Sequence, residues 1–376
     1  MSCSPTTQAT PREGVIDLAL GHPSPTLLPL ELLNRAARHR LSEGDPSTLQ
    51  YGFEQGDGRF RQALASFLGE QYAAPVSAEE LFVSNGVSQA LDLICTLYTR
   101  PGDCVFVEEP TYFLALRILA DHGLRVVGLA TDEHGLVIEA LHEALAVERP
   151  AFVYTIPSYQ NPGGITLSDE RRKTLVELAL EHGFLVVADE VYHLLSYRST
   201  PPRPLGCRSL GGSVLSLGSF SKILAPGLRL GWVQADPRLL ARLSQCGLLD
   251  SGGGLNPFTS ALVGSALERG LVGQHLEALR REYGARARAL SAALRVRLPP
   301  GSTFAEPAGG FFVWLTLPPG GDSRKLLSRG IAKGVSFVPG TRFSSREGLG
   351  DSLRLSFSYY DAELLIEGVR RLAPLV

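Results

Sequence analysis

The chain has 376 residues, of which 44% are hydrophobic, and a formal net charge of −2. This length and apolar content allow a large buried core, divided between more than one lobe. A net charge so close to zero argues against a protein held by charge on nucleic acid or on an anionic membrane. Residues 1–14 are polar, unlike a signal peptide, and no apolar run approaches the length of a membrane span. We therefore expect no nucleic-acid partner and no membrane partner.

The five cysteines are scattered, odd in number and never spaced as CxxC. Reduced thiols in a cytoplasmic protein explain this pattern better than disulfides or zinc ligands do. Glu190 and His193 lie three residues apart, but a single such pair is weak evidence, and we expect no metal site. Four arginines with interleaved apolar residues are typical of the solvated face of a long helix: Arg280, Arg281, Arg286 and Arg288.

The first part of the chain begins with a Pro-rich arm, and then short apolar strands alternate with helices. Strands apolar on both faces, each followed by a helix, imply a mainly parallel sheet covered by helices. In such sheets ligands bind beyond the carboxyl ends of the strands, where this chain places its polar clusters. The predicted strands are 81–83, 104–107, 125–129, 151–156, 184–188, 214–217 and 229–234. The predicted helices are 29–41, 59–72, 88–98, 112–121 and one that Ser168 begins and Gly183 ends.

After residue 235 the alternation gives way to helices and a few separate strands. The predicted helices are 237–249, 256–268, 273–298, 326–333 and one from Asp361, and the predicted strands are 311–315, 335–338 and 353–356. We therefore predict an α/β protein with a smaller α+β C-terminal domain. Residues 1–44 would form an N-terminal arm and helix joining the small domain, 45–272 the large domain, and 273–376 the small domain.

The stretch of residues 218–232 carries a lysine between hydroxyl groups and an arginine. Lys222 can condense with an aldehyde if its surroundings keep its amine partly neutral. Ser219, Ser221 and Arg229 combine hydroxyl donors with a planar fork, a set suited to a phosphate. An amine beside a phosphate site meets the needs of pyridoxal 5'-phosphate (PLP). For this motif alone, a surface lysine before an ordinary turn is an equally good interpretation.

Two further strand ends offer groups that complement the same cofactor. Gly86, Val87 and Ser88 begin a helix directly after a strand, where free amides and the helix dipole favour a phosphate. Asp189 ends an apolar strand, and a carboxylate there needs a cationic partner. The protonated ring nitrogen of PLP would be one, and the pair would keep the ring an electron sink. The alternative for Asp189 is a helix cap or an internal salt bridge.

Four more residues have a functional and a structural interpretation each. Tyr112 can stack on a flat ring or belong to the core, and Asn161 and Tyr192 can donate to the ring's phenolic oxygen or serve a turn and packing. Arg354 alternates with apolar neighbours on a late strand. It can clamp a substrate carboxylate if it faces inward, or lie on the surface if it faces outward, and the alternation does not decide between them.

In this context the chain resembles the fold-type I PLP-dependent class I/II aminotransferases, and within them the 2-aminoadipate and kynurenine aminotransferase-like subgroup. The motifs that carry the resemblance follow one another in family order over nearly the whole chain. They are SNGVSQAL (84–91), EEPTY (108–112), PSYQNPGG (157–164), VVADEVY (186–192), SFSK…PGLRLGW (219–232), PAGGFFVWL (307–315), FVPG (337–340) and LRLSFS (353–358).

The resemblance implies covalent attachment of PLP to Lys222, with Asp189 as partner of the ring nitrogen. It also implies ring contacts from Tyr112, Asn161 and Tyr192, and phosphate contacts from Val87, Ser88, Ser219, Ser221 and Arg229. The family usually has a hydroxyl where Val87 stands, so one side-chain contact would be missing. Substrate contacts would come from Gly21, Asn161 and Arg354. Tyr51 would reach the phosphate of a neighbouring subunit, which implies a homodimer with shared active sites.

The activity implied is transfer of an amino group between an L-amino acid and a 2-oxo acid, within amino acid metabolism and biosynthesis. Lys222 would carry the proton, and Asp189 and Tyr192 would assist. Another PLP reaction on the same fold is the main alternative: β- or γ-elimination or replacement, decarboxylation, or C–C bond formation. A ligand-sensing domain of the kind fused to transcription regulators is less favoured, because a basic winged helix is expected before such a domain.

Overall fold

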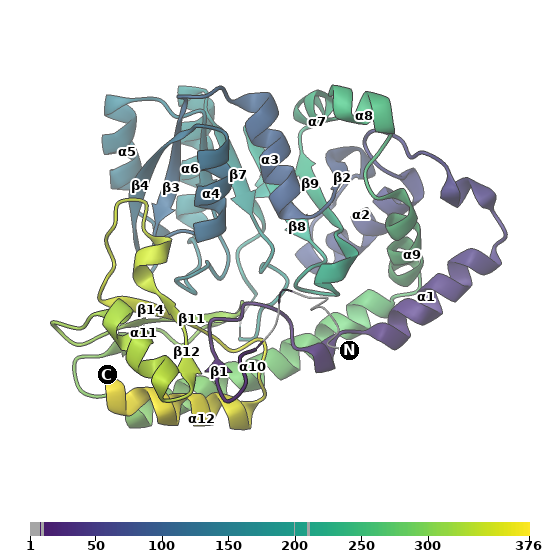
Figure 1. Cartoon of the computed structure of the whole chain (residues 1–376). Coiled ribbons are helices and arrows are strands. Elements are labelled where there is room, and N and C mark those ends of the chain that lie inside the picture. Colours follow the sequence, from purple (N-terminus) through teal and green to yellow (C-terminus); the bar gives the residue numbers. More distant parts are fainter. Residues whose placement is uncertain (1–7, 9–10, 199, 209–210) are drawn as a thin grey trace.

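The computed structural model describes residue 8 and residues 11–198, 200–208 and 211–376. Figure 1 shows a large sheet flanked by helices and a smaller lobe that contains the C-terminus. The long helix α10 (Leu271–Arg297) runs along the base of both. The chain therefore has the predicted α/β architecture with a smaller C-terminal α+β part.

The large sheet has eight strands in the order β2-β9-β8-β7-β6-β3-β4-β5. The strands β8, β7, β6, β3 and β4 are parallel to one another, whereas β9 and β5 run antiparallel to their neighbours. This confirms the mainly parallel sheet. The bounds are β2 (Leu81–Ser84), β3 (Cys104–Glu109), β4 (Arg125–Asp132), β5 (Gly135–Leu136), β6 (Phe152–Thr155), β7 (Leu185–Asp189), β8 (Val214–Ser219) and β9 (Gly231–Ala235).

The helices of the large part are α2 (Gly58–Tyr72), α3 (Val87–Tyr98), α4 (Phe113–Asp121), α5 (Ile138–Val147), α6 (Asp169–His182), α7 (Pro237–Ser244), α8 (Gly247–Gly252) and α9 (Pro257–Glu268). Helix α6 begins and ends as predicted: Ser168 Oγ accepts from the Arg171 amide over 3.3 Å, and Gly183 has a left-handed φ of 70°.

These helices differ from the prediction in two places. The single helix expected over 237–249 is two helices, because Cys246 adopts an extended conformation (φ −85°, ψ 148°) between α7 and α8. Helix α5 was not predicted. Leu141 is the one buried residue of this short helix, so its apolar periodicity is weak.

The small part contains an antiparallel sheet in the order β10-β11-β14-β13 and two helices, α11 (Ser323–Ala332) and α12 (Ala362–Leu372). Its strands are β10 (Thr303–Phe304), β11 (Phe312–Thr316), β13 (Val338–Pro339) and β14 (Ser352–Ser356). The strand expected over 335–338 is divided: β12 (Val335–Ser336) leaves this sheet and pairs in parallel with β1 (Ile16–Asp17) near the N-terminus. The domain boundaries at 44/45 and 272/273 stay predictions.

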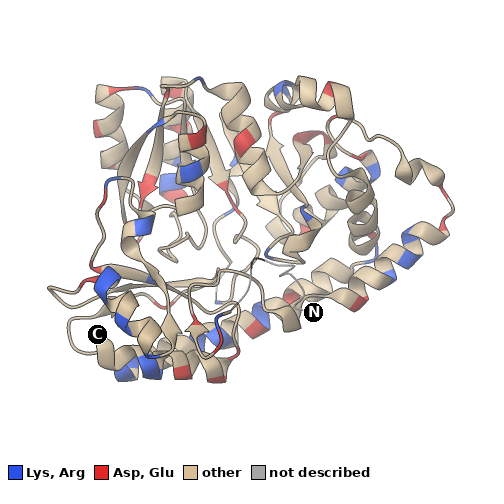
Figure 2. Cartoon of the chain, in the orientation of Figure 1, with Lys and Arg blue, Asp and Glu red and all other residues tan. Residues whose placement is uncertain are grey.

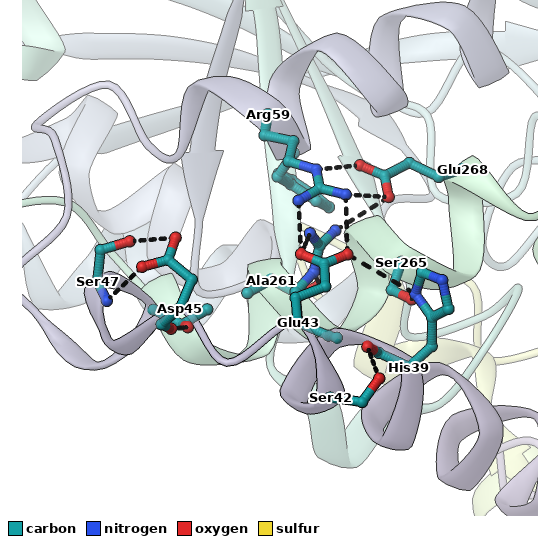
Figure 3. Close-up of polar contacts among 12 residues, drawn as sticks. His39, Ser42, Glu43, Asp45, Ser47, Arg59, Ala261, Ser265 and Glu268 are labelled. Carbon is teal, nitrogen blue, oxygen red and sulfur yellow. Dashed lines mark hydrogen bonds and ion pairs between the residues drawn. The ribbon is translucent and has the colours of Figure 1, made fainter.

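Helix α1 (Leu30–Ser42) is joined to α2 and α9 by a network of ion pairs (Figure 3). The Arg40 side chain is only 5% exposed and donates to the Ala261 carbonyl over 3.0 Å and to Glu268 over 3.1 Å. Arg59 bridges Glu268 over 2.6 Å and Glu43 over 2.8 Å. The first helix after the N-terminal arm is therefore held against the large part.

Charged residues of both signs occur along α10 and α12 in Figure 2. The arginines of α10 correct a prediction, since they do not form a uniformly solvated face. Arg286 is buried and donates to the Ser358 carbonyl over 2.9 Å, and Arg280 donates to the Leu194 carbonyl over 2.8 Å. Among the described residues no helix has the length and apolarity that crossing a membrane requires.

Candidate active site

The predicted site residues gather where the central parallel strands end. Asp189 is the last residue of β7, Lys222 follows β8, Asn161 follows β6, and Tyr112 follows β3. Because these strands are neighbours in the sheet and run in one direction, their carboxyl ends lie along one edge. The fold thus brings together residues far apart in the sequence.

Lys222 carries the reactive amine of this site. Its Nζ donates to the Gly21 carbonyl over 3.0 Å, so the N-terminal arm contacts the amine directly. Burial lowers the pKa of Lys222 to about 8; the positive charges of Arg354 and Arg229 contribute, and Asp189 opposes them. An amine with this pKa has a much larger neutral fraction at neutral pH than an ordinary lysine, as condensation with a carbonyl requires.

Hydroxyls and a guanidinium form a cluster of donors beside Lys222. Ser219 Oγ donates to Ser221 Oγ over 2.9 Å, and Arg229 Nη1 approaches Ser221 Oγ to 3.5 Å. Arg229 Nη2 donates to the Asn85 carbonyl over 3.0 Å, which holds the guanidinium beside the start of α3. We call Ser219, Ser221, Arg229 and the first turn of α3 the donor cluster.

The first turn of α3 adds backbone amides to the donor cluster. Its N-cap is Gly86, which has no side chain to bond the amides of Val87 and Ser88. Gly86 has a φ of 86°, and a Cβ there would lie 2.8 Å from Arg229 Nη2. Only glycine therefore lets Arg229 approach the helix N-terminus. Together these groups suit a phosphate, and Val87 would contribute an amide but no hydroxyl.

Asp189 is a buried carboxylate whose charge acts on the Lys222 amine. Tyr154 donates its hydroxyl to Asp189 Oδ2 over 2.8 Å, and the Val191 amide lies 3.4 Å from Oδ1. Burial raises the pKa of Asp189 to about 6, against the lowering effect of these hydrogen bonds and of Lys222. Neither hydrogen bond supplies a positive charge, so a cationic ligand would be favoured beside this carboxylate.

Tyr112 and Tyr192 are brought close to Asp189. Burial and the charge of Asp189 raise the pKa of Tyr112 to about 12, and burial raises the pKa of Tyr192 well above its ordinary range. The Tyr192 ring packs edge-on against Phe311 and Phe312, with centroids 5.5 and 5.7 Å away. Both phenols are therefore protonated donors at neutral pH.

Arg354 faces inward, which decides the question that strand alternation left open. Its Nη1 donates to Asn161 Oδ1 over 2.9 Å, and its Nη2 donates to the Ala19 carbonyl over 2.8 Å. The guanidinium lies 4.0 Å from the centre of the Phe312 ring, and Nε is buried without a partner among the described residues. Burial lowers the pKa of Arg354 to about 10, so it stays charged at neutral pH.

Tyr51 is the one predicted cofactor contact that this chain does not bring to the site. Its side chain lies on the surface and is 83% exposed, beside Gly253. An exposure this high shows that the Tyr51 side chain is not packed against the candidate active site of its own chain.

The sequence leads us to expect the substrate side-chain pocket around His22 in the N-terminal arm, and the structure gives surroundings for His22 and adds Tyr154, which the sequence analysis missed. His22 follows Gly21, and burial together with the charges of Lys222 and Arg354 lowers the pKa of His22. Its Nδ1 is buried without a partner among the described residues, so His22 borders the space beside the amine. Tyr154 was missed as a partner of Asp189. The available signal was a phenol in a strand that is otherwise apolar except for Thr155.

Glu190 and His193 have structural partners. Glu190 pairs with the buried Arg172 over 3.4 Å and accepts from Ser216 Oγ over 2.5 Å. His193 Nδ1 lies 3.0 Å from Ser158 Oγ, and burial lowers the pKa of His193 to about 3. Within the described ranges no three His, Cys, Asp or Glu side chains are grouped as metal ligands.

The chemistry of these groups fits PLP. A partly neutral amine, a donor cluster and a buried carboxylate complement an aldehyde, a phosphate and a protonated ring nitrogen, respectively. In the sheet, β8, which precedes Lys222, lies between β9, which follows Arg229, and β7, which ends at Asp189, and the charges of both residues act on the Lys222 amine.

Comparisons with known proteins agree with this chemistry. The family model described as aminotransferase class I and II matches residues 13–372. The aromatic-amino-acid aminotransferase 1 of Thermococcus litoralis is 36% identical over 96% of this chain and 88% of that protein. The 2-aminoadipate transaminase of Thermus thermophilus is also 36% identical, over 96% of this chain and 90% of that protein. Among solved structures, this chain is similar to α-aminoadipate aminotransferase from Thermus thermophilus complexed with N-(5'-phosphopyridoxyl)-L-leucine, with a TM-score of 0.87. The two are 35% identical, and the match covers 96% of this chain and 92% of that one.

Proposed function

Because the chain belongs to the family of class I and II aminotransferases, we propose that the residues around Lys222 carry out its transfer of an amino group from an L-amino acid to a 2-oxo acid. Enzymes of this family depend on PLP, so the chain is a PLP-dependent aminotransferase. One observation supports the residue assignment most strongly: the Lys222 amine, whose pKa is lowered to about 8, lies beside the donor cluster and interacts with the charge of Asp189.

When bound, PLP supplies a carbonyl that condenses with amines and an electron-poor ring that stabilises negative charge on the adjacent carbon. Lys222 Nζ would anchor the cofactor and, as the general base, take the proton from the substrate Cα. Its lowered pKa suits this task, since a base with a pKa near the working pH is deprotonated and still accepts a proton.

We assign the remaining cofactor contacts by chemical complementarity. Asp189 would hold the protonated ring nitrogen, and the donor cluster, including the amides of Val87 and Ser88, would hold the phosphate. Tyr112 would lie against the ring, and Tyr192 and Asn161 would donate to its phenolic oxygen, since both tyrosines are protonated.

Arg354 and Asn161 would bind the substrate α-carboxylate beside Gly21. The planar fork of Arg354 can make two parallel hydrogen bonds and so fixes the orientation of the substrate. An orientation that directs the Cα–H bond perpendicular to the cofactor ring favours loss of the proton over loss of CO₂. The carboxylate would also neutralise the charge that Arg354 carries in a buried place.

We propose a homodimer in which Tyr51 completes the site of the other subunit. Tyr51 belongs to a group of large apolar residues that the chain leaves exposed: Leu30 at 80%, Leu49 at 73% and Phe53 at 76%. Exposed apolar surface of this kind is usually covered by a partner, and a second copy would cover it symmetrically.

The substrates would be small molecules, an amino acid and a 2-oxo acid, with a side-chain pocket next to His22. The four described cysteines are free thiols, which supports a reducing compartment, the cytoplasm. Cell fractionation would test the compartment.

A half-reaction tests the activity. Purified enzyme mixed with an amino donor and no acceptor should release about one 2-oxo acid per subunit and then stop, because the amino group stays on the enzyme. Adding a 2-oxo acid should restart the release. Continuous release of ammonia or CO₂ without an acceptor would instead identify elimination or decarboxylation.

A further inference from the structure

Tyr154 makes the shortest side-chain contact to Asp189. Tyr154 lies on β6 and is fully buried, and its hydroxyl is 2.8 Å from Asp189 Oδ2. Strand β6 pairs in parallel with β7, with Tyr154 opposite Val187, so the phenol reaches the carboxylate from the neighbouring strand. The Asp189 carboxylate is therefore fixed by two strands: β7, to which it belongs, and β6, which supplies the Tyr154 hydroxyl.

The surroundings of Tyr154 do not otherwise call for a hydroxyl. On β6, Phe152 and Val153 are apolar and fully buried, and the hydroxyl of Thr155 is already hydrogen-bonded to Glu108, while phenylalanine at position 154 would fill nearly the same volume. A buried phenol needs a hydrogen-bond partner, and Asp189 is the one that the structure gives it. The function of this hydroxyl therefore concerns the carboxylate.

The groups that face Asp189 shift its pKa in opposite directions. Burial raises its pKa, and Glu190, the next residue in the chain, raises it further. Tyr154 from β6, the Val191 amide and Lys222 beyond β8 lower it. Tyr112 at the start of α4 and Tyr192 in the loop after β7 are neutral phenols that respond to its charge. The Tyr154 hydrogen bond is the largest of the effects that favour the ionised carboxylate.

We propose that Tyr154 is a positioning residue for Asp189, whose hydroxyl holds the carboxylate in place and keeps it ionised for pairing with the cofactor's ring nitrogen. This inference rests on the proposed function. Tyr154 does not itself contact the reacting atoms; it acts through Asp189.

The test is the pH dependence of PLP binding to the Tyr154→Phe apoenzyme, followed by visible absorbance between about pH 5.5 and 8.5. Without the hydroxyl, Asp189 should become protonated at a higher pH, so PLP affinity should begin to fall at a higher pH than in the wild type. Because Asp189 titrates near pH 6, a displacement of about one pH unit would weaken binding about fivefold at pH 6 and leave it nearly unchanged near pH 8. In steady-state assays kcat should fall while KM for the donor changes little.

Tyr98→Phe is the matched control. Tyr98 also donates through one hydrogen bond, to the Leu239 carbonyl over 2.7 Å, but at the far end of α3. Both variants should lose some thermal stability, but only Tyr154→Phe should displace the curve of PLP affinity against pH. In an Asp189→Asn background, Tyr154→Phe should have no further effect on PLP affinity. Fluorotyrosine at position 154, a stronger donor with a nearly native shape, should displace the curve in the opposite direction.

Equal pH curves for Tyr154→Phe and the wild type would overturn the proposal. A displacement that persists in the Asp189→Asn background would also overturn it, since the effect would not pass through Asp189. Failure of the wild-type apoenzyme to bind PLP would instead refute the proposed residue assignment as a whole, and that outcome is visible before any variant is made.

Discussion

Arg354 Nη1 and Asn161 Oδ1 are 2.9 Å apart. This hydrogen bond joins β14, an inner strand of the small sheet, to the loop that follows β6 of the large sheet. A substrate carboxylate bound by both would therefore be held between the two sheets. Arg354→Lys should raise KM and lower kcat/KM for every donor alike, by about 10- to 100-fold, because an ammonium group cannot replace a bidentate fork.

Steady-state kinetics with several donors checks this, together with the PLP content of the variant, which should match the wild type. Arg329→Lys, on the exposed surface of α11, is the matched control and should change neither value. A loss restricted to one class of donor would show that Arg354 contacts the side chain and not the α-carboxylate.

Lys222 should be the residue that attaches the cofactor. Borohydride reduction of the holoenzyme, followed by proteolysis and mass spectrometry, should find the phosphopyridoxyl group on the peptide that contains Lys222. Lys222→Ala should retain no attached cofactor after denaturation and should be inactive. Lys173→Ala, at an exposed lysine of α6, should behave as the wild type. Attachment that survives in Lys222→Ala would contradict the assignment.

The rate of PLP attachment to the apoenzyme should depend on pH through the Lys222 amine. The neutral amine is the reactive form, and its pKa is lowered to about 8. The rate should therefore be nearly constant above pH 8 and fall about tenfold per pH unit well below it. Stopped-flow absorbance would measure it. A rate that still rises steeply up to pH 10 would mean that the folded chain leaves the lysine unperturbed.

Asp189→Asn should keep PLP attached but slow removal of the substrate Cα proton by about 100- to 10,000-fold, since a neutral amide cannot keep the ring nitrogen protonated. Loss of deuterium from Cα-labelled substrate measures this step directly. Asp236→Asn removes the charge of the side chain that caps α7 and is a control for a carboxylate with a structural role. Exchange close to the wild-type rate would mean that Asp189 is likewise structural.

Mixed dimers should test the shared site. Tyr51→Phe and Lys222→Ala chains should each be weakly active or inactive alone. Refolded together, they should recover about one quarter of wild-type activity, because half of the dimers would carry one intact site. Mixing either variant with itself is the control. An active monomer in sedimentation experiments would rule out a site shared between subunits.

Local motifs made much of the site predictable from the sequence. Lys222 and Asp189 follow apolar strands directly, and parallel strands that are neighbours in a sheet bring their carboxyl ends together. The start and end of α6 were predictable for the same reason, since the capping residues Ser168 and Gly183 act only on the helix turns next to them. Features of this kind depend on a few adjacent residues.

Other features depend on pairing across the chain, which a single sequence does not reveal. The inward direction of Arg354 shows only in its contacts with Asn161 and Ala19, because strand alternation is symmetric between the two faces. The contact of Tyr154 with Asp189 requires the register of β6 on β7. The strand expected over 335–338 divides because each half finds a different partner, one of them at the opposite end of the chain.

The pairing of β1 with β12 has a consequence for synthesis of the protein on the ribosome. Ile16 and Asp17 emerge first, but their partners Val335 and Ser336 emerge only when nearly the whole chain has been made. The parallel sheet of the large part can form earlier, because its strands follow one another closely in the sequence. The arm that carries Gly21 to Lys222 therefore stays unpaired until late, and a contact of such high sequence separation forms slowly. Competence to retain the cofactor should accordingly appear only after Val335 and Ser336 have left the ribosome.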